Sequence, residues 1–295
     1  MNSPSLLTPP RPAAMKRANN SAVTLISKYF TGIVPTTPLQ QLADDACPAA
    51  TRALLQFAND IGFAVGYDRE QSGRLVQDIF PVRASETAQV STSSKVMLGS
   101  HTETAFHRHR PRYVVLLCLR GDAAAATTYA DVNDIVELLS IEHLAVLQTT
   151  DFVTTVDPSF MTKGEPDAEV VVQPLAFTNG AWVLVYDELL MRGTTERAQA
   201  ALAELHRAVK LATQHVVLSD GDVLVIDNDR AVHGRTPFMP RYDGTDRWLK
   251  RALVVRELPH GDVLGRVIQT RLPSSLAGSH GLYGDTTYSL CRFSD

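Results

Sequence analysis

The chain has 295 residues, of which 44% are hydrophobic and 20% charged, and its formal net charge is -4. This is the composition of a soluble globular protein, and the small acidic excess gives no electrostatic reason to expect a nucleic acid partner. No stretch reaches the roughly 18 consecutive apolar residues that a membrane-spanning helix needs, so no membrane partner is expected. The length exceeds that of most domains, but barrels and sandwiches with inserted helices reach it as one unit.

The cysteines indicate the cellular compartment of the protein, and the N-terminal residues indicate where its domain begins. Cys47, Cys118 and Cys291 are too few and too scattered for a disulfide framework, which favours the reducing cytoplasm. Residues 1–20 carry prolines and small polar residues but no apolar core of a signal peptide. We therefore expect a flexible tail over residues 1–20 and a single domain over residues 21–295.

Short strands dominate the predicted secondary structure. Apolar residues recur at helical spacing over residues 38–63, where Pro48 must break or restart the helix. A second amphipathic helix lies in an insertion at residues 194–217, and residues 258–295 are rich in loop signals. Runs of β-branched and aromatic residues predict strands at residues 112–119, 169–177, 182–186, 222–227 and 252–257. This order indicates an α+β, mainly β fold with a double-stranded β-helix (jelly roll) core and flanking helices.

Three side chains from two distant segments form a candidate metal site. His101 and Glu103 are two residues apart, so on an extended strand both side chains project from the same face. His233 follows a predicted strand by a short loop, which lets it approach from across a sandwich. Two imidazoles and one carboxylate are the facial triad of non-haem Fe(II) oxygenases, which leaves three coordination positions for a cosubstrate and O2.

The His-x-acid spacing also occurs at His260-Gly261-Asp262. Only His280 lies downstream of that match, too close in sequence for the strands that would return a third ligand. We expect His107 and His109, which continue the polar run after Glu103, to be solvated.

A second requirement of such chemistry is an anchor for the far carboxylate of 2-oxoglutarate, because the metal chelates only the keto-acid end. A buried arginine with two parallel donors suits this task. Arg247 and Arg251 lie at the start of the strand that follows His233, and Arg247 is our candidate anchor.

The segments HTE at His101, DNDRAVHGR ending at Arg235, and RYDGTDRWLKR ending at Arg251 occur in this order. Together they resemble the clavaminate synthase-like branch of the Fe(II)/2-oxoglutarate dioxygenases, over roughly residues 60–258. The resemblance implies that His101, Glu103 and His233 bind the iron. It also implies that Arg247 binds the 2-oxoglutarate carboxylate with help from Thr127, for which Thr128 is the competing choice. Arg251 matches a position that faces the cosubstrate or a substrate carboxylate.

The same resemblance suggests where the substrate binds. Residues 89–95, which include Ser93 and Ser94, precede the metal strand and contribute to the substrate side of the pocket in this family. The alternative interpretation of residues 89–95 is a polar loop without a role in binding. Asp187 matches a position where family members place pocket residues. It either binds a cationic group of the substrate or only caps a turn.

The expected activity is hydroxylation of an unactivated C–H bond in an amino acid or an amino-acid-derived small molecule, with Fe(II), 2-oxoglutarate and O2. Glu103 disfavours halogenation, because related halogenases lose this carboxylate to admit a halide. Desaturation, epoxidation or cyclisation, including of a cyclic dipeptide, is an alternative outcome, since no residue type in the sequence distinguishes these reactions from hydroxylation. A metal-binding jelly-roll sensor without turnover is the alternative from another class of protein.

Overall fold

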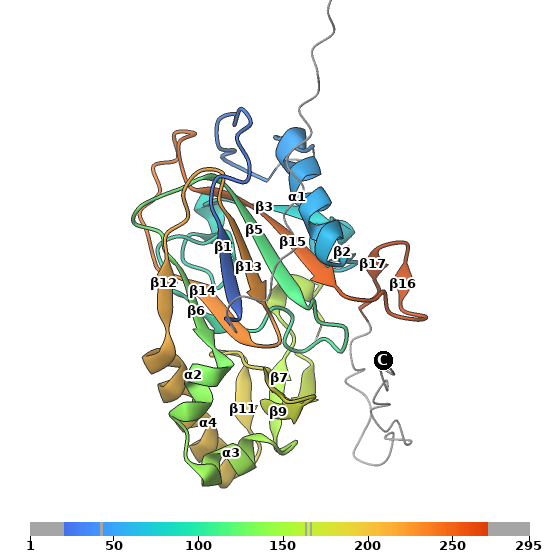
Figure 1. The fold of residues 1–295 in the computed structure, drawn as a ribbon, viewed down its shortest axis with the longest axis vertical. Coiled ribbons are helices and arrows are strands. Elements are labelled where there is room, and N and C mark those ends of the chain that lie inside the picture. The colour runs from blue at the N-terminus through green and yellow to red at the C-terminus, as the bar shows by residue number, and fades with distance from the viewer. Residues whose placement is uncertain (1–20, 42–43, 163, 166, 271–295) are drawn as a thin grey trace, which may run out of the picture.

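A computed structural model of the protein describes residues 21–41, 44–162, 164–165 and 167–270. The predicted tail at residues 1–20 and the end of the chain from residue 271 lie outside these ranges. The described part is built on two mainly antiparallel sheets that both line a central cavity, with helices on the outside (Figure 1). The predicted jelly-roll architecture is therefore confirmed.

The larger sheet forms one wall of the cavity. Its strands are antiparallel except where β17 pairs with β2. Their order is β1 (Val23–Ile26), β13 (Val223–Asp227), β5 (Tyr113–Arg120), β15 (Trp248–Val255), β2 (Phe63–Tyr67), β17 (Val267–Ile268) and β16 (Val263–Leu264), with β3 (Val76–Ile79) paired to β15.

The smaller sheet forms the opposite wall. Its order is β12 (Gln214–Val216), β6 (Thr127–Asp131), β14 (Ala231–Arg235) and β4 (Leu98–His101). Side chains of both sheets line the same cavity, among them Arg247 and Leu249 beside or on β15, and His101 and His233 on β4 and β14. The two sheets thus bring residues more than a hundred positions apart to one place.

Helix α1 (Pro48–Ile61) covers the outer face of the larger sheet (Figure 1). The strand alternation of β15 explains this packing, because successive side chains point to opposite faces. Trp248, Ala252 and Val254 pack in the core beneath α1, whereas Leu249 and Leu253 pack in the core between the sheets. Helix α1 begins at Pro48. Proline is tolerated there because a backbone N–H in the first turn of a helix has no acceptor within the helix.

The other helices gather at one end of the molecule (Figure 1). Their apolar faces share one core with strand residues from the β7 to β11 region. The elements of this end are α2 (Val132–Glu137), α3 (Ile141–Leu147), β7 (Phe152–Thr155), β8 (Glu169–Val172), β9 (Leu175–Thr178), β10 (Ala181–Leu184), β11 (Met191–Gly193) and α4 (Glu196–Ala212). Three short 3-10 helices complete the list, at Gln71–Gly73, Arg83–Ser85 and Pro158–Phe160.

The predicted elements occur in the structure with four differences in their bounds. The strand predicted over residues 252–257 begins earlier, at Trp248, and ends at Val255. The helix predicted over residues 38–63 exists only from Pro48 onward. The strand predicted over residues 169–177 is split into β8 and β9 at Gln173-Pro174, because proline has no N–H for the ladder. The insertion at 194–217 holds helix α4, capped by the Thr195 hydroxyl, and also the short strand β12. No helix in the described ranges is both long enough and apolar enough to cross a membrane.

Candidate metal and cosubstrate site

Two histidines face each other across neighbouring strands. His101 is the last residue of β4, and His233 is its direct partner on β14. Partners in an antiparallel pair point to the same face of the sheet, so both imidazoles project into the cavity. Their ring centroids are 4.5 Å apart.

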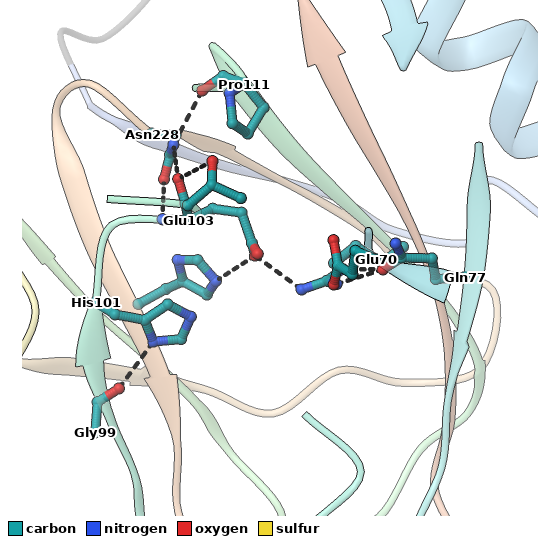
Figure 2. A network of polar contacts seen from close by, with 10 residues as sticks. Glu70, Gln77, Gly99, His101, Glu103, Pro111 and Asn228 are labelled. Carbon is teal, nitrogen blue, oxygen red and sulfur yellow. Dashed lines mark hydrogen bonds and ion pairs between the residues drawn. The ribbon is translucent and has the colours of Figure 1, made fainter. Parts of the chain in front are cut away.

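Glu103 reaches the histidines by a different route from the predicted one. The extended strand that would hold His101 and Glu103 on one face ends at His101, and Glu103 lies in the following turn. Because a turn has no ladder of strand hydrogen bonds, the backbone of Glu103 needs other partners. Its N–H donates to the side-chain oxygen of Asn228 at 2.8 Å, and its carbonyl accepts from the side-chain nitrogen of Asn228 at 3.1 Å (Figure 2).

The three side chains converge on a common point. One ligand atom from each of His101, Glu103 and His233 lies within 4.8 Å of the other two. Nε2 of His233 lies 3.6 Å from Oε2 of Glu103. Figure 2 shows the Glu103 carboxylate at the centre of a connected polar network, and the His101 ring joined to Gly99.

The hydrogen bond of His101 and the charge states of Glu103 and His233 suit metal binding. Nδ1 of His101 donates to the carbonyl of Gly99 at 2.9 Å, which leaves the lone pair of Nε2 for a metal. Burial lowers the pKa of His233 to about 4, and the neighbouring His101 acts in the same direction. Burial would raise the pKa of Glu103, but the Arg251 guanidinium and the two imidazoles outweigh it and hold this pKa below its usual range.

Neutral imidazoles and an ionised carboxylate are the forms that bind a metal ion. A set of two histidines and one carboxylate fits Fe(II) and leaves open positions for a bidentate cosubstrate and O2. The geometry and the charge states therefore fit the metal that the sequence analysis implied.

Arg247 is a buried guanidinium that forms no ion pair with a carboxylate of the described residues. It lines the cavity, and within the described residues its polar contact is from Nη2 to the hydroxyl of Thr127, at 3.2 Å. Burial lowers its pKa to about 10, so it remains charged at neutral pH. Burying an uncompensated charge is costly unless an anion joins it. The structure brings Arg247 to Thr127, the first choice of the sequence analysis, and not to Thr128.

Arg251 is held quite differently from Arg247. Its guanidinium donates to Oε2 of Glu103 at 2.9 Å, to the carboxylate of Glu70 and to the side-chain oxygen of Gln77. Burial opposes its charge, but Glu103 and Glu70 raise its pKa above the usual value. Arg251 thus links the candidate metal ligand to a second buried carboxylate, Glu70, which the sequence analysis did not single out.

The cavity has a volume of about 410 Å3. Both sheets contribute to its wall, together with the turn after β2, the loop before β4 and the turns that follow β7 and β10. Besides the triad, Arg247, Arg251 and Thr127, the wall includes Glu70, Gln71, Gln89, Val90, Ser91, Thr92, Leu116, Thr154, Asp157, Phe160, Asp187, Leu189, Leu190, Arg235 and Leu249.

The predicted substrate residues differ in position. Asp187 lines the cavity, and its Oδ1 also accepts from the backbone N–H groups of Leu189 and Leu190, so it caps a turn as well. Ser93 and Ser94 are buried but lie behind the wall, which the preceding residues 89–92 form instead.

Arg235, two residues after His233, holds the loop that contains Ser93. Its guanidinium donates to the carbonyl and hydroxyl of Ser93 and to the carbonyl of Val96. The DNDRAVHGR segment contained this arginine, but the sequence alone offered no signal for its partner.

His107 is a buried residue, so the prediction that it is solvated is wrong. Its Nδ1 accepts from the backbone N–H of His109 at 3.0 Å, and its ring packs edge-on against Tyr67. Burial lowers the pKa of His107 to about 4, and the neighbouring His109 and Arg108 act in the same direction.

This histidine should make stability depend on pH. The unfolded chain binds a proton at His107 below about pH 6.5, whereas the folded protein does so only near pH 4. The free energy of unfolding therefore falls as pH is lowered through this window, by about 2 kcal/mol from this group between pH 7 and pH 5. Urea unfolding of the metal-free protein at both pH values measures the loss. His107→Gln should show a smaller loss than the parent protein, and an equal loss would contradict the prediction.

Comparison with known proteins agrees with this arrangement. Residues 45–253 match the family described as taurine catabolism dioxygenase TauD, TfdA family. An L-lysine 3-hydroxylase of Catenulispora acidiphila is 34% identical over 247 residues, which are 81% of this chain and 69% of the relative. An L-asparagine oxygenase of Streptomyces coelicolor is 36% identical over 229 residues, 77% of this chain and 68% of the relative.

A solved structure extends the likeness to three dimensions. The crystal structure of an asparagine oxygenase with Fe(II), 2S,3S-3-hydroxyasparagine and succinate superposes with a TM-score of 0.74 at 32% identity, over 85% of this chain and 80% of that one. The fold and the matches define a non-haem iron oxygenase that depends on 2-oxoglutarate. The chain belongs to the TauD/TfdA family of dioxygenases.

Proposed function

We propose that the protein hydroxylates an unactivated C–H bond of an amino acid or a close amino-acid derivative. The observation that carries this proposal is the convergence of His101, Glu103 and His233 in a cavity that also holds the buried Arg247, which pairs with no carboxylate of the described residues. The relatives named above, a lysine hydroxylase and an asparagine oxygenase, support an amino acid as the substrate.

Each part of the site has a distinct task in this proposal. His101, Glu103 and His233 hold Fe(II), and Arg247 with Thr127 binds the distal carboxylate of 2-oxoglutarate. When bound, the iron and 2-oxoglutarate supply an O2-derived oxidant strong enough to attack a C–H bond. The protein holds the target carbon at the reacting position and excludes water from it. Glu103 occupies the position that a halide would need, so we do not propose halogenation.

The polar wall beside the triad suits the two charges of an amino acid. Arg251 offers a guanidinium to a substrate carboxylate, and Glu70 offers an acceptor to a substrate ammonium group. Oε2 of Glu70 is buried and has no hydrogen-bond partner within the described ranges. Burial raises the pKa of Glu70 despite Arg251, and an ammonium group would oppose that rise.

The remaining acids of the cavity favour a basic side chain. Asp157 and Asp187 each use Oδ1 to accept from turn amides, and neither forms an ion pair with another described residue. A substrate side chain that ends in an amine or a guanidine would complement them, and an amide side chain would do so more weakly.

Asp157→Asn is therefore expected to raise KM for a basic amino acid roughly 10- to 100-fold, since a hydrogen bond to a charged group contributes about 1.5–3 kcal/mol. Steady-state kinetics with L-lysine, L-ornithine and L-arginine measure the change. Asp134→Asn, on the exposed face of α2, is the matched control and should leave KM unaltered. Unchanged KM values in Asp157→Asn would remove this residue from the proposed substrate contacts.

Other outcomes of the same oxidant remain testable alternatives. Desaturation, epoxidation or cyclisation, also of a cyclic dipeptide, requires only that the substrate radical be held away from the hydroxyl it would otherwise receive. Product mass distinguishes them, because hydroxylation adds one oxygen and desaturation removes two hydrogens. A sensor without turnover is no longer needed as an explanation, since the family is one of dioxygenases.

A substrate screen tests the proposal. The protein is incubated with Fe(II), ascorbate, 2-oxoglutarate and single free amino acids or cyclic dipeptides, and succinate and product mass are measured. Succinate release that rises with one amino acid, together with a product heavier by one oxygen, is the expected result. No stimulation by any amino acid would contradict the proposal.

We propose the cytoplasm as the site of action. The buried cysteines Cys47 and Cys118 are free thiols, and a reducing compartment keeps both thiols and Fe(II) in the required states.

A further inference from the structure

Asn228 lies at the junction of the three candidate metal ligands. It follows β13 directly, five residues before His233, and its side chain is fully buried. Its amide oxygen accepts from the backbone N–H of Glu103, and its amide nitrogen donates to the carbonyls of Glu103 and Pro111 (Figure 2). One side chain therefore satisfies both backbone polar groups of the carboxylate ligand.

Glu103 depends on this contact more than the histidines depend on theirs. His101 and His233 are held by the β4–β14 ladder, whereas Glu103 lies in a turn whose next residue, Thr104, has a φ of 51°. A buried backbone N–H or carbonyl without a partner costs free energy, so the turn keeps its shape only where such partners exist. The Thr104 hydroxyl also donates to the Glu103 carbonyl, at 2.8 Å, but it leaves the N–H of Glu103 to Asn228.

The turn that carries Asn228 is itself anchored. The Arg112 guanidinium pairs with the carboxylates of Asp227 and Asp229 on either side of Asn228. The backbone N–H of Asn228 donates to the Arg112 carbonyl at 2.9 Å. The same turn leads directly into β14, which carries His233. Asn228 thus connects the backbone of Glu103 to the hairpin of the distal histidine.

We propose that Asn228 is a positioning residue that holds the Glu103 carboxylate at metal-binding distance from His233. This inference rests on the proposed metal site. An asparagine suits the role because its amide offers an acceptor and two donors at once. Aspartate would retain the acceptor for the N–H of Glu103 but would place lone pairs against two carbonyls, and alanine would leave all three backbone groups without this partner.

Metal affinity tests the proposal without reliance on turnover. Co(II), which is stable in air and absorbs visible light when bound, is titrated into the metal-free parent protein, Asn228→Asp and Asn228→Ala. Partners that orient a metal ligand typically contribute 10- to 100-fold to metal affinity. We expect the dissociation constant for Co(II) to rise by this factor in both variants, with a changed absorption spectrum that reports an altered carboxylate position.

Controls separate positioning from a loss of stability. Thr195→Ala removes the N-cap of α4, which is not part of the cavity wall, and should lower the melting temperature while leaving Co(II) affinity unchanged. Asn228→Ser provides a milder variant if Asn228→Ala does not fold.

The outcomes distinguish the inference from the proposed function. If the parent protein binds Co(II) and His101→Ala does not, the metal site stands. Folded Asn228 variants that then bind Co(II) as tightly as the parent, with an identical spectrum, would overturn the positioning role alone. A parent protein that binds no Co(II) would overturn the metal site, and the positioning role with it.

Discussion

His101→Ala is expected to lose at least a hundredfold in the rate of substrate-stimulated succinate formation. The substitution removes one of only three protein ligands, an effect larger than the 10- to 100-fold typical of residues that merely orient a ligand. It should also abolish the rise in melting temperature that a bound metal ion gives the parent protein, because that rise reflects binding to the folded state alone. Succinate assays and thermal melts with and without Fe(II) under anaerobic conditions measure both effects.

His215→Ala is the matched control for this loss. His215 lies exposed on β12, in the same sheet as His101 and His233 but outside the cavity wall. We expect it to leave both the succinate rate and the metal-dependent melting shift unaltered. If His101→Ala turned over at the parent rate, the metal site would have been assigned to the wrong residues.

The second large effect is expected for Arg247→Gln, which should raise KM for 2-oxoglutarate by roughly 30-fold to several thousandfold. Removing one partner of a buried, hydrogen-bonded charge pair costs about 2–5 kcal/mol, and roughly 1.4 kcal/mol corresponds to tenfold in affinity. Among the described residues, the Arg247 guanidinium has a polar contact with the Thr127 hydroxyl, whereas the other arginines of the wall, Arg235 and Arg251, already donate to protein partners of their own. Steady-state kinetics at varied 2-oxoglutarate concentration measure the change.

Two variants sharpen this test. Arg247→Lys keeps the charge but lacks the paired donors, so its KM should lie between those of the parent and Arg247→Gln. Arg197→Gln, on the exposed face of α4, should have the parent KM. An unchanged KM for 2-oxoglutarate in Arg247→Gln would exclude this arginine as the cosubstrate anchor and would direct attention to Arg251.

The sequence predicted the jelly-roll architecture because strand signals depend on local patterns. The run of residues 112–119 and the run of residues 222–227 both match observed strands to within a residue or two, since alternation and β-branched side chains act over short distances. Helix α4 was equally readable from its apolar stripe. The break at Pro174 and the late start of α1 at Pro48 were signalled by prolines, but their consequences depend on the neighbouring strands and on the core.

The residue types of the candidate metal site were also readable in advance. Imidazoles and a carboxylate in the order of His101, Glu103 and His233 define the ligand chemistry whatever the surrounding fold. The spacing argument for Glu103 rested on a wrong premise, because its side chain approaches His233 from a turn and not from the strand. The rule that residues two apart on a strand share a face does not predict where the strand ends.

By itself, the amino-acid sequence determined which side chains are available for the proposed metal and cosubstrate binding. It did not determine the sheet that holds them, because His233 was expected to approach from across the sandwich and lies instead beside His101 in the same sheet. Only the tertiary structure decided how they are held: Asn228 on the backbone of Glu103, Arg235 on the loop of Ser93, and Arg251 between Glu70 and Glu103. The reason is physical. Strand and helix signals arise among residues that are neighbours in sequence. The hydrogen-bond partners of a buried polar group are instead the residues that lie near it in the folded chain, and a buried group without such a partner lowers stability.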